Sequence, residues 1–306
     1  MHKLESVRLS ETFAGEIKNF KITDESIENQ WASIYAAFLE YKVIVFKQQD
    51  LTPAIFAKFG KIFGDPEIHH IPAMRHPEEQ TLVMLSNQNE VGRNPIMKWF
   101  GDGWHSDSSY KRVPACATML WGTQIPQTRA DTLFSNSEAA FSDLPESEKK
   151  LLRKLRVRHQ YRWAPDRNDP WARWKFVGEG ERRATPEVVH SLIRRHPDTG
   201  KECLFLAPRV IGSVIGIQGM ATVESDALID QLIGHMTSDK YQYSHQWSNG
   251  DVIVWDNRCL LHSATTKELP AEQVRRLLRI TIKGSPVTPS EVTAGATIVV
   301  PDPEFA

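Results

Sequence analysis

Trp104-His105-Ser106-Asp107 is the stretch around which the whole chain is best interpreted. In an extended segment, side chains two residues apart project from the same face, so His105 and Asp107 can both point at one metal ion. The pattern His-x-Asp also occurs by chance in many proteins, and two ligands do not complete a metal site. A third donor must therefore come from a distant part of the sequence.

The best candidate for that third donor is His262. It closes the segment 255–262, Trp-Asp-Asn-Arg-Cys-Leu-Leu-His, which follows the apolar, strand-like run 251–254. Two histidines and one carboxylate on one face of an ion leave three coordination positions open. This arrangement is typical of non-haem Fe(II) oxygenases.

Length and composition indicate an ordinary globular protein. The chain has 306 residues, with 41% hydrophobic and 25% charged residues and a formal net charge of -1. This length is ample for a large core, and we expect one domain over residues 1–306. The balanced charge does not favour nucleic acid or an anionic membrane as a partner, and it is compatible with a homo-oligomer.

Three cysteines and the absence of long apolar runs bear on location. Cys116, Cys203 and Cys259 are odd in number and widely separated, which does not suggest a disulfide framework and fits a reducing compartment. The residues 1–6 lack a signal-peptide pattern, and no run of about 18 apolar residues occurs. The sequence therefore predicts a cytoplasmic protein.

The first 80 residues predict helices and one buried strand. Apolar side chains recur at helical spacing over 27–41, at Ile27, Trp31, Ile34, Tyr35 and Phe38. A buried strand is expected over 43–46. Thr52-Pro53 then has the form of a helix cap followed by proline, and the helix should run to about Phe63 and stop at Gly64.

From about residue 80 to 285 the sequence has a β character. Short β-rich runs occur at 81–85, 115–120, 241–245 and 277–282, separated by Gly, Pro and Asn, with helical interruptions near 145–155 and 222–235. Strand and helix do not alternate regularly, so a doubly wound fold is not supported. We expect a mostly β fold with flanking helices, a double-stranded β-helix (jelly-roll) barrel, and an irregular surface tail over 286–306.

The strand expected near residues 275–282 carries two arginines on one face. Period-two alternation places Arg275, Leu277, Arg279 and Thr281 on one side, and Arg276, Leu278, Ile280 and Ile282 on the other. If the apolar side packs under other elements, Arg275 and Arg279 point into the barrel, where unpaired charge is costly. Either internal acids pair with them, or they bind carboxylates of ligands in a bidentate manner.

Several motifs, taken in order, resemble one known family. These are the 104–107 segment, Asp131-Thr132-Leu133-Phe134, the segment from Gly250 to His262, and the pair Arg275 and Arg279. Together they resemble the taurine dioxygenase and aryloxyacetate dioxygenase (TauD/TfdA) family of Fe(II)- and 2-oxoglutarate-dependent oxygenases, from about residue 30 to 285.

The resemblance implies roles for individual residues. His105, Asp107 and His262 would be the iron ligands, Thr132 and Arg275 would hold the distal carboxylate of 2-oxoglutarate, and Arg279 would bind the acidic group of the substrate. Some family members also use a histidine after the second helix, for which His69 and His70 are candidates and His70 is preferred.

The resemblance also implies a reaction. With Fe(II), 2-oxoglutarate and O2, such an enzyme hydroxylates a small or medium anionic organic substrate, with fragmentation of some products, and releases succinate and CO2. Gly101-Asp102-Gly103 departs from taurine-specific members, which disfavours taurine itself. The tryptophan-rich stretch 161–174 corresponds to a lid in relatives.

Two alternatives remain: a zinc hydrolase using the same three ligands, and a non-catalytic jelly-roll binding module.

Overall fold

The structure is a computed structural model that describes residues 4–69, 72–87, 101–128, 130–160, 186–208, 213–267, 269–270 and 272–290. Its strands are β1 (Ser6–Arg8), β2 (Gly15–Ile17), β3 (Val43–Phe46), β4 (Val83–Ser86), β5 (Ala117–Gln124), β6 (Thr132–Asn136), β7 (Arg156–His159), β8 (Val188–Ser191), β9 (Ile193–Arg195), β10 (Glu202–Leu204), β11 (Val214–Ile217), β12 (Gln242–His245), β13 (Val252–Asp256), β14 (Leu260–Ala264), β15 (Arg276–Ile282) and β16 (Thr288–Pro289). Its helices are α1 (Asp24–Tyr41), α2 (Pro53–Gly60), α3 (Ser137–Ser142), α4 (Glu146–Leu152) and α6 (Thr222–Met236), with short 3₁₀ helices η1 (Lys61–Phe63), η2 (Pro72–Met74) and η5 (Asp239–Tyr241). The described part of the chain is mostly β, as predicted.

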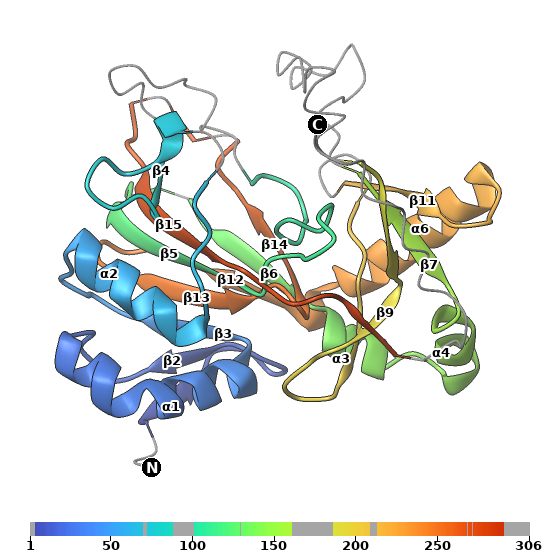
Figure 1. Cartoon of the computed structure of the whole chain (residues 1–306), viewed down its shortest axis with the longest axis horizontal. Coiled ribbons are helices and arrows are strands. Elements are labelled where there is room, and N and C mark those ends of the chain that lie inside the picture. The colour runs from blue at the N-terminus through green and yellow to red at the C-terminus, as the bar shows by residue number, and fades with distance from the viewer. Residues whose placement is uncertain are drawn as a thin grey trace, which may run out of the picture.

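The largest sheet has seven strands in the order β1-β2-β3-β13-β5-β15-β4. Its neighbouring strands are antiparallel except for the β2–β3 pair, which is parallel. Helices α1 and α2 lie along one face of this sheet (Figure 1). Because one face is covered by helices, the site must be built on the opposite face.

Period-two alternation in β13 distributes its side chains between the two faces. Val252 and Val254 pack in the core beneath α1 and α2, whereas Ile253 and Trp255 belong to a second core on the opposite face. Strand β15 obeys the same rule. Leu278 packs toward the helices, and Leu277 packs toward the second core. The predicted separation of the faces of this strand is therefore confirmed.

A second sheet, of order β12-β6-β14, faces the seven-stranded sheet across that second core. Phe134 of β6 is fully buried, and its ring centroid lies 5.5 Å from that of Trp255. Strand β14 pairs with β6 so that His262 lies opposite Phe134. A tight turn joins β13 in one sheet to β14 in the other, so the segment around residue 257 crosses from sheet to sheet.

The N-terminal helices form where the sequence predicts them. Thr23 caps α1 by accepting a hydrogen bond from the backbone N–H of Ser26, and Ser26 completes a capping box. Trp31 shares the helical spacing of the apolar face, but its side chain is 56% exposed. The buried arc of α1 is centred on Ile34 and includes Tyr41, so Trp31 lies beyond its edge.

The second helix begins at the predicted cap, with the Thr52 side chain accepting from the backbone N–H of Ile55 and Pro53 in the first turn. The helix becomes 3₁₀ over Lys61–Phe63 and ends at Gly64, whose φ is +132°. A left-handed conformation of this kind favours glycine, which explains why the helix stops there.

A further core lies among α3, α4, α6 and two three-stranded sheets, β11-β7-β8 and β10-β9-β16. The C-terminal tail was expected to be irregular, but Thr288–Pro289 forms β16 and pairs with β9. The backbone N–H of Ser290 donates to Ile193 O, so unsatisfied strand-edge groups of β9 provide the physical reason. Among the described residues, no helix is both long and apolar enough to cross a membrane.

Gly250, at the turn before β13, offers a test of backbone strain. Its φ is +83°, and a Cβ added there would lie 2.8 Å from the carbonyl oxygen of Gln49. We expect Gly250→Ala to lower the free energy of unfolding by about 1–3 kcal/mol, because strain in the left-handed region and the close contact act together. The measurement is urea unfolding at equilibrium.

Gly234 is the matched control, because it lies within α6 and a Cβ there would meet nothing within 4 Å. Gly234→Ala should leave stability unchanged or raise it by about 0.5–1 kcal/mol. If Gly250→Ala were as stable as Gly234→Ala, the turn would not constrain the start of β13.

Candidate metal centre

The fold brings the first and third predicted ligands into direct backbone contact. The N–H of His105 donates to the carbonyl of His262, and the N–H of His262 donates to the carbonyl of His105, each at 2.9 Å. This isolated antiparallel bridge places residue 105 beside β14. The two imidazole centroids are 4.1 Å apart, so both rings face the same space.

Asp107 completes the group. Its Oδ1 lies 3.8 Å from His105 Nε2, and its Oδ2 lies 3.7 Å from His262 Nε2. One donor atom from each of the three residues lies within 4.8 Å of the others, and both Asp107 and His262 are buried. Three converging donors of this kind fit an Fe(II) ion bound from one side.

The protonation of the two rings suits metal binding. His105 Nδ1 is 2.8 Å from the Gly103 carbonyl, which can only accept a hydrogen bond. Nδ1 therefore carries the proton, and Nε2 presents its lone pair to the centre of the group. Burial lowers the pKa of His262 well below its usual value, so this ring is neutral, as a metal ligand must be.

The Asp107 carboxylate is stabilised in its charged form. Burial alone would raise its pKa, but the guanidinium of Arg279, with Nη2 2.8 Å from Oδ1, holds that pKa well below its usual range. Thr118 Oγ1 donates to Oδ2 at 2.6 Å. Of the two alternatives for the strand arginines, Arg279 thus meets an internal acid, and that acid belongs to the candidate metal centre.

Arg275 has a different environment. Burial lowers the pKa of this arginine to about 10, while Asp102 and Asp131 raise it, and its Nε has no hydrogen-bond partner. Within the described part of the chain, no acid forms an ion pair with it. A guanidinium whose Nε is buried without a hydrogen-bond partner fits the second alternative, in which the carboxylate of a ligand satisfies it.

Thr132 and Arg275 both lie beside the side chain of Trp247. Trp247 Nε1 donates to Thr132 Oγ1 at 2.9 Å, and the guanidinium carbon of Arg275 lies 6.0 Å from the centroid of the Trp247 ring. The structure therefore brings the two residues expected to hold 2-oxoglutarate around one indole. His70 and the stretch 161–174 lie outside the described residues.

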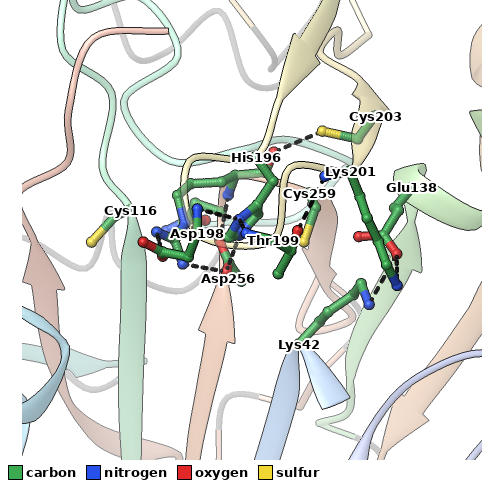
Figure 2. Close-up of polar contacts among 12 residues, drawn as sticks. Lys42, Cys116, Glu138, His196, Asp198, Thr199, Lys201, Cys203, Asp256 and Cys259 are labelled. Carbon is green, nitrogen blue, oxygen red and sulfur yellow. Dashed lines mark hydrogen bonds and ion pairs between the residues drawn. The ribbon is translucent and has the colours of Figure 1, made fainter. Parts of the chain in front are cut away.

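A second group of metal-binding side chain types occurs at His196, Asp256 and Cys259 (Figure 2). His196 Nδ1 accepts from the backbone N–H groups of residues 198 and 199, so Nε2 carries the proton and donates to Asp256 Oδ2 at 2.9 Å. Since neither nitrogen offers a lone pair to an ion, this group is a buried hydrogen-bonded network and not a metal site.

Sequence reasoning missed two polar residues that contact the Asp107 segment, Thr118 and Asn257. Both are almost fully buried. The signal that could have found Asn257 was a polar run, Asp256-Asn257-Arg258, directly after an apolar strand. Thr118 gave no signal, because a threonine in a β-rich run is ordinary.

A mostly β fold that presents two histidines and a carboxylate on one side of a site defines the class of non-haem metal oxygenases. The nearby Arg275, which forms no ion pair with any acid that the structure describes, suits the carboxylate of a ligand. The chain belongs to the family described as "Taurine catabolism dioxygenase TauD, TfdA family", which matches residues 5–281. The predicted family is confirmed. The protein is an Fe(II)- and 2-oxoglutarate-dependent dioxygenase that uses O2.

Curated relatives and solved structures agree with this assignment. The chain is 29% identical over 269 residues to (S)-phenoxypropionate/alpha-ketoglutarate-dioxygenase of Sphingobium herbicidovorans, covering 87% of this chain and 91% of that protein. It is 28% identical over 297 residues to alpha-ketoglutarate-dependent 2,4-dichlorophenoxyacetate dioxygenase of Burkholderia sp. (strain RASC), covering 92% and 95%. A taurine dioxygenase from Burkholderia xenovorans superposes with a TM-score of 0.75 at 26% identity, covering 93% and 92%. The hydrolase and binding-module alternatives gain no support from these matches.

Proposed function

We propose that His105, Asp107 and His262 hold the Fe(II) of this dioxygenase, and that its substrate is a small or medium anionic organic acid. The observation that carries the proposal is the convergence of the three donors within 4.8 Å, from segments about 155 residues apart in sequence. Two relatives whose names give phenoxypropionate and 2,4-dichlorophenoxyacetate as substrates support the acid class.

We propose that Arg275 and Thr132 bind the distal carboxylate of 2-oxoglutarate. The guanidinium is a forked donor suited to two carboxylate oxygens, and the hydroxyl of Thr132 lies beside the same indole. Burial makes this contact stronger than it would be in water, because the surrounding dielectric constant is low.

Bound Fe(II), with 2-oxoglutarate and O2, supplies the oxidising power that hydroxylates a carbon of the substrate and yields succinate and CO2. The protein holds the donors and captures the anions. His105 keeps its proton on Nδ1 through Gly103, and Arg279 keeps Asp107 ionised. The apolar side chains around Trp255 and Phe134 keep water away from His262.

We propose that Arg279, together with His70, recognises the acidic group of the substrate. Support for Arg279 comes from its place against Asp107, which puts a cation within reach of any substrate that lies beside the metal. Because Arg279 also contacts Asp107, it stabilises the charged form of this proposed metal ligand.

A spectroscopic experiment tests the proposed function as a whole. Fe(II) and 2-oxoglutarate are added to the metal-free protein without oxygen, and a visible charge-transfer band is expected. Air is then admitted with a panel of organic acids, and succinate is measured. A spectrum unchanged by both additions, with no succinate under any acid, would remove the proposed function.

We further propose that the seven-stranded sheet and the β12-β6-β14 sheet are the two halves of a double-stranded β-helix, and that residues 1–306 form a single domain. The sheets share a core and are joined by the turn between β13 and β14.

All three cysteines are free and buried, which supports the expected cytoplasmic location.

Replacing Arg279 distinguishes substrate capture from 2-oxoglutarate capture. We expect Arg279→Gln to reduce substrate-dependent succinate release by roughly 30-fold or more, since truncating one partner of a buried charge pair costs about 2–5 kcal/mol. The slow succinate release that occurs without substrate should persist. The 2-oxoglutarate concentration that half-saturates this reaction should equal that of the wild type. Both activities are measured by succinate formation. A shift in that concentration would assign Arg279 to 2-oxoglutarate instead.

A further inference from the structure

A closed ring of hydrogen bonds links Asp107, Asn257 and Thr118. The backbone N–H of Asp107 donates to Asn257 Oδ1 at 3.4 Å, and Asn257 Nδ2 donates to Thr118 Oγ1 at 2.9 Å. Thr118 Oγ1 in turn donates to Asp107 Oδ2 at 2.6 Å. The ring thus begins and ends on the same residue.

The direction of each hydrogen bond in this ring is fixed by chemistry. The amide nitrogen of Asn257 can only donate, so the Thr118 oxygen accepts from it and must turn its own hydrogen elsewhere. The ionised Asp107 carboxylate can only accept, so that hydrogen points at Oδ2. Both Thr118 and Asn257 are at most 1% exposed, so water does not compete for these contacts.

Asn257 is itself held in place from several directions. Trp255 Nε1 donates to its Oδ1 at 3.0 Å, and Ser106 Oγ donates to its backbone carbonyl at 2.9 Å. Asp256 and Arg258, on either side of it, form a buried pair in which Arg258 Nη2 lies 2.7 Å from Asp256 Oδ2. Figure 2 shows a dashed line between Asp256 and His196, the residue that directly follows β9.

The same turn also fixes His262. Strand β14 begins at Leu260, directly after the turn, and carries His262 two residues further on. A rigid turn at 256–259 therefore sets the position of Asn257 relative to β14, and Asn257 sets the position of Asp107 relative to His262. Two ligands that are remote in sequence are thereby tied to one element.

We propose that Thr118 and Asn257 are positioning residues that fix the orientation of the Asp107 carboxylate for metal binding. This inference rests on the proposed function, because it takes Asp107 as a metal ligand. The hydroxyl of Thr118 occupies one lone pair of Oδ2, while Arg279 Nη2 lies 2.8 Å from Oδ1, so each oxygen is held by one donor and keeps a lone pair for the metal ion. Partners of this kind typically contribute about 10- to 100-fold to metal affinity.

The test measures the dissociation constant of Mn(II) from metal-free protein by calorimetry, beside the melting temperature of the metal-free protein. Thr118→Val has the same shape but lacks the hydroxyl, and we expect it to weaken Mn(II) binding by about 10- to 100-fold. Thr118→Ser keeps the hydroxyl and should bind within about threefold of wild type.

Ser137→Ala is the matched control for general loosening of the turn. Ser137 Oγ is buried and donates to the carbonyl of Cys259 at 2.8 Å, in the same turn, but it makes no contact with Asp107. It should lower the melting temperature while leaving Mn(II) affinity unchanged. If Ser137→Ala and Thr118→Val weakened Mn(II) binding equally, the positioning role would be overturned.

Asn257→Leu provides a second variant, with a side chain of similar size and no added charge. It removes both the donor to Thr118 Oγ1 and the acceptor for the Asp107 N–H, so we expect weaker Mn(II) binding. Because both residues act on one carboxylate, the double variant should lose less affinity than the sum of the two single losses. Additive losses would overturn the proposal, because they would mean that the two residues act separately.

The result is distinguishable from failure of the metal site. If wild-type protein binds no Mn(II), or if His105→Ala binds it as tightly as wild type, the proposed ligands are wrong. If wild type binds Mn(II), His105→Ala does not, and Thr118→Val binds like wild type, the metal site stands and the positioning role alone is wrong.

Discussion

Replacing His105 with alanine is expected to abolish both Fe(II) binding and succinate release. The side chain supplies one of the three donors. Loss of a hydrogen-bond partner of a ligand already lowers metal affinity by up to about 100-fold, so loss of a ligand itself should lower Fe(II) affinity further. The fold should persist, because residue 105 is tied to β14 by backbone hydrogen bonds that alanine retains. Metal content after dialysis, succinate formation and melting temperature are the measurements.

His235 provides the control for this replacement. It also is a partly buried histidine with one ring hydrogen bond, to the carbonyl of Ala140, but it lies on α6 away from the three donors. His235→Ala should keep full metal content. Retention of stoichiometric Fe(II) by His105→Ala would show that the metal is bound elsewhere.

Truncation of Arg275 should have the second largest effect, on 2-oxoglutarate. Removing one partner of a buried charge pair costs about 2–5 kcal/mol, so Arg275→Ala is expected to raise the 2-oxoglutarate concentration for half-maximal activity by roughly 30- to 4,000-fold. Arg275→Lys keeps the charge but loses the forked geometry, and it should fall between alanine and wild type. Titration of the charge-transfer band with 2-oxoglutarate measures binding directly.

The next residue in the sequence is the matched control. Arg276 lies on the opposite face of β15, is exposed, and donates to Gln124 Oε1 at 2.8 Å. Since exposed pairs contribute about 0–1 kcal/mol, Arg276→Ala should change the 2-oxoglutarate requirement by less than about fivefold. Equal effects of the two replacements would mean that Arg275 does not face the site.

Much of this arrangement could be predicted from local pattern. The alternation in β15 and the cap at Thr52 are short-range signals, and the structure reproduces both. The exposure of Trp31 could not be predicted, because a helical repeat gives the apolar side of α1 but not the width of the arc that its neighbours cover. The expectation of an irregular segment is wrong at Thr288–Pro289 for a related reason, since pairing of β16 depends on the open edge of β9.

The sequence by itself determined which residue types are available and which of them share a face: His105 with Asp107, and Arg275 with Arg279. Only the tertiary structure decided that Arg279 meets Asp107 while Arg275 meets no acid among the described residues, and that Thr118 and Asn257 complete the surroundings of the carboxylate. The physical reason is one of range. Side-chain direction follows from backbone periodicity over a few residues, whereas contacts across two sheets depend on the register of strands far apart in the chain.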